Sequence, residues 1–309
     1  MREKILVLYG GLSRERDISI KSGKAVSAAL RKKNFEVSEY DFDGKLEKAI
    51  DYYKPDIVFI ALHGNFGEDG TVQGSLELLG IPYTGSGVLA SSLCMNKLFS
   101  KWMFKQIGVK TPEYFSMRKD SIISYREASL FLKTDRIVIK PNDQGSTLGI
   151  SIVSDEKNYK QGLDEAFNLS EIVIAEEYIK GTEITISIIG NYPEIKVLPI
   201  IEIVPVHEYY DFTSKYIPGM SRHLIPARIS KSVESISNDY GRKIYESFNL
   251  RDFSRIDMIV NGEVPYVLEA NTIPGFTETS LVPDAAKFVG ITFEDLVEFI
   301  VIEALKRRK

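Results

Sequence analysis

Four polar residues in the last third of the chain have types and spacing that suit a metal site. Arg255 and Asp257 are two residues apart in an alternating run, so they share one face of a predicted strand. Glu269 and Asn271 share one face of the next predicted strand for the same reason. If Asp257 lies opposite Glu269, the hairpin loop between these strands must contain three or five residues. We therefore expect two carboxylates, an amide and a guanidinium close together.

Two adjacent carboxylates repel each other unless a cation lies between them. Mg²⁺ prefers oxygen ligands and leaves coordination positions for phosphate groups, so Asp257, Glu269 and Asn271 are candidate Mg²⁺ ligands. A solvated strand face with ordinary ion pairs remains the alternative when spacing alone is considered.

A second candidate site follows a predicted buried strand over residues 137–140. This strand ends at Lys140, and the loop after it contains Gly145 and Ser146. Backbone N–H groups in such a loop can bind an anion, so a phosphate site is one interpretation and a plain hairpin is the other. Other signatures are missing from the sequence: it has no G-x-x-x-x-G-K-[ST], no second cysteine beside Cys94 for zinc, and no G-x-S-x-G.

Strands alternate with helices in the first ninety residues. The predicted strands cover residues 5–9, 35–41 and 57–62, and the predicted helices cover residues 18–33 and 45–53. This order predicts a parallel sheet in an α/β lobe. Ligands of such sheets bind at the carboxyl ends of the strands, where Gly10-Gly11 and His63-Gly64 lie.

The pattern changes near residue 96 and again near residue 182. The middle part has predicted helices at 97–107 and 158–167 and strands at 136–140, 148–153 and 172–178. The last part has predicted strands at 183–189, 196–204, 253–260 and 264–271 and helices at 232–248, 281–289 and 293–305. We therefore expect three lobes, an α/β lobe at 1–95 and two α+β lobes at 96–182 and 183–309.

Composition limits the functional classes. The chain has 309 residues with 39 basic and 43 acidic side chains, and this net charge of −4 argues against nucleic acid as the main partner. The single cysteine, Cys94, excludes an intrachain disulfide and is expected to be buried. We expect a cytoplasmic protein with no membrane partner, because residues 5–9 are too short for a signal-peptide core and no apolar run could span a bilayer. Residues 306–309, all cationic, are expected to be the solvated end of a helix, with an anionic-surface tag as the alternative.

Taken together, these segments resemble the D-alanine–D-alanine ligase family of the ATP-grasp superfamily. The matching residues are Gly10-Gly11 with Ser13, Glu15 and Ser19; Leu62-His63-Gly64 with Gly67-Glu68-Asp69-Gly70; Pro82-Tyr83-Thr84-Gly85-Ser86-Gly87; Lys140-Pro141; Arg255-Ile256-Asp257; and Glu269-Ala270-Asn271-Thr272 with Pro274-Gly275. They occur in order over nearly the whole chain. The His63 loop and the run at 269–275 are specific to this family, whereas the oxygen cluster is shared by ATP-grasp enzymes generally.

The resemblance implies an ATP-grasp fold in which the second and third lobes grip ATP. It assigns Lys97 and Lys140 to the ATP phosphates and Lys215 to ATP. The residues that it assigns to adenine and ribose are Glu176, Tyr178, Ile179 and Glu183. It assigns Asp257, Glu269 and Asn271 to Mg²⁺, with Mn²⁺ as an alternative and one or two ions bound.

Further residues are assigned to the amino acids by the same resemblance. His63 and Arg255 are expected around the first D-alanine, and Ser280 and Leu281 at the carboxylate of the second. The Gly275 N–H and Arg255 are expected to hold the tetrahedral oxyanion. Glu15, Ser146 and Tyr216 are expected to form a hydrogen-bonded trio that closes a lid made by residues 144–149 and 206–222. Four residues depart from the family pattern: Asn96, Gln144, Thr147 and Glu177.

The implied activity is the ATP-dependent joining of two D-alanines through an acyl phosphate, for peptidoglycan precursor synthesis. Alternatives are an ATP-grasp ligase for other amino acids, a ligase that joins D-alanine to D-lactate, and a nucleotide-binding module without activity. Every expected ligand and lysine is present, which argues against the inactive module. Tyr216 favours the dipeptide over the D-lactate product, because relatives that make the latter generally lack this tyrosine. We also expect a homodimer.

Overall fold

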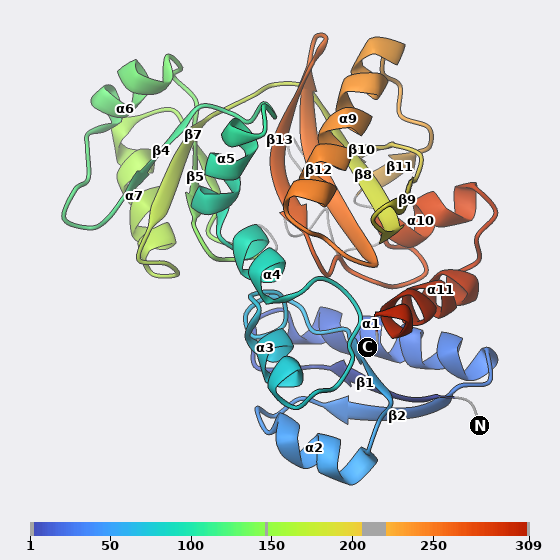
Figure 1. Ribbon diagram of the computed structural model, residues 1–309. Coiled ribbons are helices and arrows are strands. Elements are labelled where there is room, and N and C mark those ends of the chain that lie inside the picture. Colours follow the sequence, from blue (N-terminus) through green and yellow to red (C-terminus); the bar gives the residue numbers. More distant parts are fainter. Residues whose placement is uncertain (1–2, 146–147, 206–220, 308–309) are drawn as a thin grey trace.

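The chain folds around three β-sheets, which Figure 1 shows as three separate groups of strands. The computed structural model describes residues 3–145, 148–205 and 221–307. The blue N-terminal sheet lies at the bottom of the view, and the green and orange sheets lie side by side above it. No helix within the described residues is long and apolar enough to cross a membrane.

The first sheet is parallel, as the alternation of strands and helices predicts. Its strands, in spatial order, are β2 (Glu36–Asp41), β1 (Lys4–Tyr9) and β3 (Ile57–Ile60). Its helices are α1 (Arg16–Lys32) and α2 (Leu46–Tyr53), followed by α3 (Thr71–Leu78), which was not predicted, and α4 (Val88–Met95). The loops after β1 and β3 lead to the site described below, as expected for a parallel sheet.

The second sheet is antiparallel. Its strands, in spatial order, are β4 (Tyr114–Met117), β7 (Val173–Glu177), β5 (Ile137–Pro141) and β6 (Ser151–Val153). Its helices are α5 (Lys97–Gln106), α6 (Tyr125–Leu132) and α7 (Glu156–Phe167). Asn96 caps α5 by accepting a hydrogen bond from the Phe99 N–H at 3.0 Å, which an aspartate at this position would also do.

The third sheet is also antiparallel. Its path is β11 (Ser221–Leu224), β10 (Ile201–Pro205), β8 (Thr182–Asn191), β12 (Phe253–Asn261) and β13 (Val264–Asn271), with β9 (Glu194–Val197) also paired to β8. Its helices are α9 (Lys231–Ser247), α10 (Leu281–Phe288) and α11 (Phe293–Lys306). The single strand predicted over 196–204 is wrong: Pro199, which has no N–H to donate, lies between β9 and β10.

The hairpin between β12 and β13 differs from the prediction. Asp257 pairs with Glu269, as the alternation suggested, but Asn261 pairs with Val264, so only two residues form the loop. A β-bulge reconciles these two pairings, because the register shifts between Asp257 and Met258 and leaves Leu268 as the extra residue on β13. The predicted loop of three or five residues is therefore wrong.

The C-terminal helices belong to the same core as the first sheet. Buried residues of α10 and α11 form one cluster with those of β1, β3 and α1. Phe276 joins the two regions, since its ring centroid lies 6.2 Å from that of Phe59 and 5.1 Å from that of Phe253. The core of the first sheet is thus completed by side chains from the end of the chain. Cys94 is buried, as predicted.

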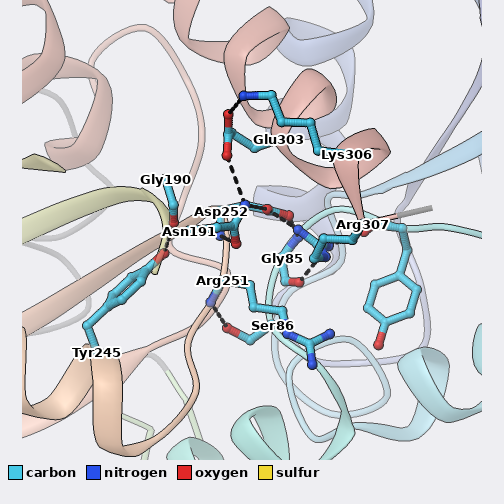
Figure 2. Close-up of polar contacts among 11 residues, drawn as sticks. Gly85, Ser86, Gly190, Asn191, Tyr245, Arg251, Asp252, Glu303, Lys306 and Arg307 are labelled. Carbon is cyan, nitrogen blue, oxygen red and sulfur yellow. Dashed lines mark hydrogen bonds and ion pairs between the residues drawn. The ribbon is translucent and has the colours of Figure 1, made fainter. Parts of the chain in front are cut away.

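A buried carboxylate, Asp252, links the C-terminal helix to the loop before α4 (Figure 2). The Gly85 N–H donates to Asp252 at 2.7 Å, and the Asn191 amide donates to it at 3.0 Å. Arg307 donates to Asp252 and, at 2.9 Å, to the carbonyl oxygen of Tyr83. Arg307 therefore does not belong to a solvated helix end, and the prediction for residues 306–309 is wrong at this position.

Candidate active site

A cleft of about 370 Å³ lies between the second and third sheets. Seven of the residues predicted to contact nucleotide or metal line it: Lys140, Glu176, Tyr178, Ile179, Glu183, Asp257 and Glu269. Apolar side chains complete the walls, with Ile150 and Ile152 from the second lobe and Leu268 from the bulge. The cleft thus combines an apolar surface for a base with charged groups for phosphates.

The lysine and carboxylate at the base of this cleft are paired. Lys140 Nζ donates to Glu176 Oε2 at 2.8 Å, and both side chains are almost completely buried. Nearby, the Tyr178 ring lies 4.1 Å from the Arg136 guanidinium carbon, a cation–π contact. Glu177, which departs from the family pattern, accepts a hydrogen bond from the Glu113 N–H at 2.9 Å.

The predicted oxygen cluster assembles on β12 and β13. Asp257 accepts hydrogen bonds from Arg255 Nε at 2.9 Å and Arg255 Nη2 at 2.8 Å, so the pair is bidentate. Thr185 on β8 donates to Asp257 Oδ1 at 2.6 Å, and Asn271 Nδ2 donates to Asp257 Oδ2 at 3.1 Å. Glu269 stands directly opposite Asp257. The donor set is two carboxylates and one amide, which are the oxygen ligands that Mg²⁺ prefers; no group of three histidine, cysteine or acidic residues suited to a metal occurs among the described residues.

Lys97 approaches the same cluster from the start of α5. Its Nζ donates to the carbonyl oxygen of Gln144 at 2.6 Å and lies 3.8 Å from Glu269 Oε2. Gln144 also departs from the family pattern, and its side chain donates to the Leu169 carbonyl oxygen at 3.1 Å. Lys97, Gln144 and Glu269 line a common small cavity of about 30 Å³.

A second small cavity, also of about 30 Å³, lies beyond Glu269. Six predicted site residues line it: Glu15, His63, Arg255, Glu269, Asn271 and Gly275. Glu269 lines this cavity, the cavity at Lys97 and the large cleft. A group bound in the cleft and a group bound in the small cavity would therefore meet at this carboxylate.

His63 lies at the small cavity with both ring nitrogens hydrogen-bonded inside the protein. Nδ1 is 3.0 Å from the carbonyl oxygen of Ile273, so this nitrogen carries the proton. Nε2 is 3.0 Å from Ser22 Oγ, which itself accepts the Phe276 N–H at 3.1 Å. Burial lowers the pKa of His63 to about 4, so the ring is neutral at pH 7. His63 and Ser22 thus hold the loop from Ile273 to Phe276.

Glu15 lies where the first lobe meets the glycine-rich loop of the second. A Cβ on Gly145 would be 2.6 Å from Glu15 Oε2, and one on Gly64 would be 2.5 Å from it, so only glycine fits at either position without movement. Removal from water and the adjacent Glu15 carboxylate raise the pKa of Glu68, whose Oε2 accepts the Gly64 N–H at 2.7 Å.

The remaining amino-acid contacts lie at the start of α10. Ser280 precedes the helix, and its hydroxyl accepts the Thr277 N–H at 3.0 Å. A Cβ on Gly275 would lie 3.6 Å from Ser280 Oγ, so these two predicted residues are neighbours. Leu281 is the first residue of the helix, where backbone N–H groups favour an anion. Ser146, Lys215 and Tyr216, and most of the predicted lid at 206–222, lie outside the described residues.

Several residues of the site were not predicted, and some left a signal in the sequence. Ser22 lies on the buried face of α1, four residues before Val26, where a hydroxyl needs a partner. Val267 and Ala270 are both buried although they are three residues apart in one strand, which is the spacing that a bulge produces. Thr185 alternates with the isoleucines of β8, as Glu183 and Ser187 also do, and has no comparable signal.

A cleft between two antiparallel sheets, lined by a buried lysine and by paired carboxylates on adjacent strands, defines an ATP-grasp enzyme. A crystal structure of D-alanine–D-alanine ligase from Bacillus anthracis complexed with ATP has a TM-score of 0.85 and 34% identity, and the alignment covers 99% of this chain and 98% of that chain. The D-ala D-ala ligase N-terminus profile matches residues 43–86 and the C-terminus profile matches residues 103–302.

Curated relatives agree over nearly the full length. The D-alanine–D-alanine ligase of Syntrophotalea carbinolica is 44% identical over 307 residues, which cover 99% of this chain and 98% of the relative. That of Carboxydothermus hydrogenoformans is 42% identical over 311 residues, with 99% of each chain covered. The chain belongs to the D-alanine–D-alanine ligase family.

Proposed function

We propose that this protein joins two D-alanine molecules to D-alanyl-D-alanine while ATP is converted to ADP and phosphate. The observation that carries the proposal is the position of Glu269, which lines both the large cleft and the small cavity beside Arg255 and Gly275. A γ-phosphate in the cleft and a carboxylate in the small cavity would meet there. The dipeptide would then serve as a peptidoglycan precursor.

In the first step, the carboxylate of one D-alanine attacks the γ-phosphorus, and ADP leaves. Lys97 and Lys140 hold the phosphate oxygens and offset their charge. Mg²⁺, when bound by Asp257, Glu269 and Asn271, supplies further positive charge at the same oxygens. The product is an acyl phosphate, which water would hydrolyse, so exclusion of water from the site favours the second step.

In the second step, the neutral amine of the other D-alanine attacks the acyl carbon; the C–N bond forms, the bond to phosphate breaks, and the nitrogen loses one proton to the departing phosphate. Arg255 and the Gly275 N–H bind the oxyanion of the tetrahedral intermediate. The bidentate pairing with Asp257 fixes the plane of the Arg255 guanidinium. The start of α10, at Ser280 and Leu281, binds the carboxylate of the attacking amino acid, and its closeness to Gly275 supports this assignment.

Three assignments concern residues that the structure does not describe. We propose that Ser146 and Tyr216 form hydrogen bonds with Glu15, and the support is the closeness of Glu15 to Gly145, the residue before Ser146. We also propose that Lys215 contacts ATP, as the family resemblance implies. His63 is proposed to border the first D-alanine through its ring and to hold the Ile273–Gly275 loop through its nitrogens.

The larger organisation also remains a proposal. We infer lobes at 1–95, 96–182 and 183–309 because each contains one of the three sheets, apart from Thr182, the first residue of β8. A homodimer is proposed from the exposed leucines on neighbouring helices, Leu78 on α3 and Leu89 on α4, which are 91% and 78% exposed. A cytoplasmic location is proposed because the reaction consumes ATP, which the cytoplasm supplies. Light scattering of the purified protein and of Leu78→Glu tests the dimer.

Release of ADP from the purified protein tests the activity. It should depend on D-alanine and should not occur with L-alanine or without an amino acid, and mass spectrometry should identify D-alanyl-D-alanine. With D-lactate in equal supply, the dipeptide should remain the main product at neutral pH. Equal ADP release in all three conditions would exclude the ligase, and mainly D-alanyl-D-lactate would reassign the second substrate.

A further inference from the structure

A second lysine of α5, Lys101, lies behind the nucleotide cleft. It follows Lys97 by one helical turn, and its side chain is only 1% exposed. Its Nζ donates to Thr111 Oγ1 at 2.6 Å and lies 5.1 Å from the centroid of the Tyr114 ring. Burying an ammonium group is costly unless it is paired, so a fully buried lysine beside a site requires an explanation.

The partner that balances Lys101 is a carboxylate of the cleft itself. Lys101 Nζ is 3.1 Å from Glu176 Oε1, while Glu176 Oε2 accepts the bond from Lys140. One carboxylate is thus shared between two ammonium groups, one on each oxygen. Glu176 and Lys140 line the cleft, whereas Lys101 reaches it only through Glu176.

The charges of these three side chains determine how strongly Lys140 can attract an anionic ligand. A buried Glu176–Lys140 pair alone would be neutral, and the attraction of Lys140 for a phosphate would be largely cancelled by the adjacent carboxylate. With Lys101 present, the group carries one net positive charge. This charge can be directed at the cleft only through Lys140, because Lys101 is enclosed.

We propose that Lys101 is a positioning residue for phosphoryl transfer: it offsets the charge of Glu176 and so leaves Lys140 able to bind the ATP phosphates. This inference rests on the proposed function in one respect, namely that the cleft binds ATP with its phosphates at Lys140. A lysine that merely fills the core would matter equally for every ligand of the cleft. Lys101 should instead matter much more for the phosphates than for the base.

The direct test compares ATP with adenosine. Lys101→Met should weaken ATP binding by about tenfold or more, because the offsetting charge is lost, and should change adenosine binding by less than about threefold. Lys101→Arg should restore ATP affinity to within about threefold.

Lys105→Met is the matched control. Lys105 lies one turn further along α5, and its Nζ is 4.8 Å from the same Tyr114 ring, but its side chain is 46% exposed and paired with Glu113. Its replacement should leave both affinities within about threefold. Equal losses of ATP and adenosine affinity in Lys101→Met would overturn the proposal. An unmodified protein that binds adenosine but not ATP, or neither, would instead overturn the proposed function.

A second measurement uses only well-folded proteins. The charged and titratable groups that face Lys101 are Glu176 on β7, Lys140 on β5, Lys105 on α5 and Tyr114 on β4. Burial lowers the pKa of Lys101 to about 8, so the unmodified protein should lose ATP affinity between about pH 7 and about pH 9 while Lys101→Arg does not. Adenosine affinity should stay constant in both proteins over this range. Parallel pH curves for ATP in the two proteins would overturn the proposal.

Discussion

Asp257 and Glu269 lie directly opposite each other on β12 and β13, and the register of the two strands changes immediately beyond them. Because the extra residue falls at Leu268, two neighbours in the chain, Leu268 and Glu269, both line the nucleotide cleft. Strict alternation would have turned one of them into the core. The bulge therefore adds an apolar side chain for the nucleotide without displacing the carboxylate pair.

Replacing either carboxylate by its amide should remove activity without unfolding the protein. Glu269→Gln and Asp257→Asn keep the side-chain size but remove a charged oxygen ligand beside the transferred phosphoryl group. We expect ADP formation to fall by about 100-fold or more in each variant at saturating ATP. ADP release measured across a Mg²⁺ titration, together with thermal melts, checks this.

Glu263→Gln is the control for that experiment, since Glu263 lies in the hairpin loop and contacts Ser230. Its activity and Mg²⁺ dependence should match those of the unmodified protein. Near-normal turnover of folded Glu269→Gln at low Mg²⁺ would show that this carboxylate is not a metal ligand.

Deleting Leu268 should remove one nucleotide contact and leave the carboxylate pair in place. Without the extra residue, Val267 is followed directly by Glu269, so Glu269 still falls opposite Asp257. We expect KM for ATP to rise by about tenfold, from the loss of one apolar wall, with kcat little changed. Leu268→Ala should behave similarly in steady-state kinetics. A deletion variant that folds but has no turnover, beside an active Leu268→Ala, would mean that the bulge itself places Glu269.

Acidic solution should destabilise the protein through His63. The pKa of this buried ring is lowered from its ordinary value of 6.5 to about 4, so below pH 6.5 the unfolded chain binds a proton that the folded chain does not. Stability should be unaffected by His63 above pH 7 and should fall by up to about 3 kcal/mol between pH 6.5 and pH 4. Urea denaturation at several pH values measures this slope.

His63→Gln should reduce that slope, because the amide supplies one donor and one acceptor and does not titrate. His223→Gln should retain it, because His223 is partly exposed and bonds to Asp284 at the surface. An unchanged slope in His63→Gln would assign the acid sensitivity to other groups.

Removing the guanidinium from Asp252 should be costly. Arg307→Met leaves a fully buried carboxylate with only the Gly85 N–H and the Asn191 amide, so we expect a loss of about 3–5 kcal/mol in the free energy of unfolding. Asp252→Asn in the same chain should recover part of it, because no charge then remains buried. Lys243→Met, which removes an exposed cation paired with the exposed Asp239, should cost less than about 1 kcal/mol. Equal losses in Arg307→Met and Lys243→Met would contradict the role given to Asp252.

The parts of the fold that could be predicted are those set by short-range pattern. The first sheet follows from alternating strands and helices, and the face shared by Arg255 and Asp257 follows from the period of a strand. Two short elements, α3 and β4, were not predicted. They have only eight and four residues, which are too few to give a clear periodic pattern of apolar side chains.

The site was less predictable where partners are far apart in the chain. His63 was expected near the substrate, but its bonds to Ser22 and to Ile273 cross 41 and 210 positions, and no local pattern reports them. From the sequence, Arg307 was expected to be one of four solvated cations, because its partner Asp252 is 55 positions away. The burial of Lys101 could not be predicted for the same reason, because it depends on Glu176 in another element.

The contact between Arg307 and Gly85 spans 222 positions, and this affects how the protein forms during synthesis. The residues of the first sheet leave the ribosome long before α11 is made, and a chain folds from its N-terminal part as it emerges. Until α11 arrives, the apolar side chains of α1 and β3 that it later covers are exposed to water, and Asp252 lacks its arginine. A chain whose translation stops before α11 would therefore present this uncovered surface to chaperones and proteases.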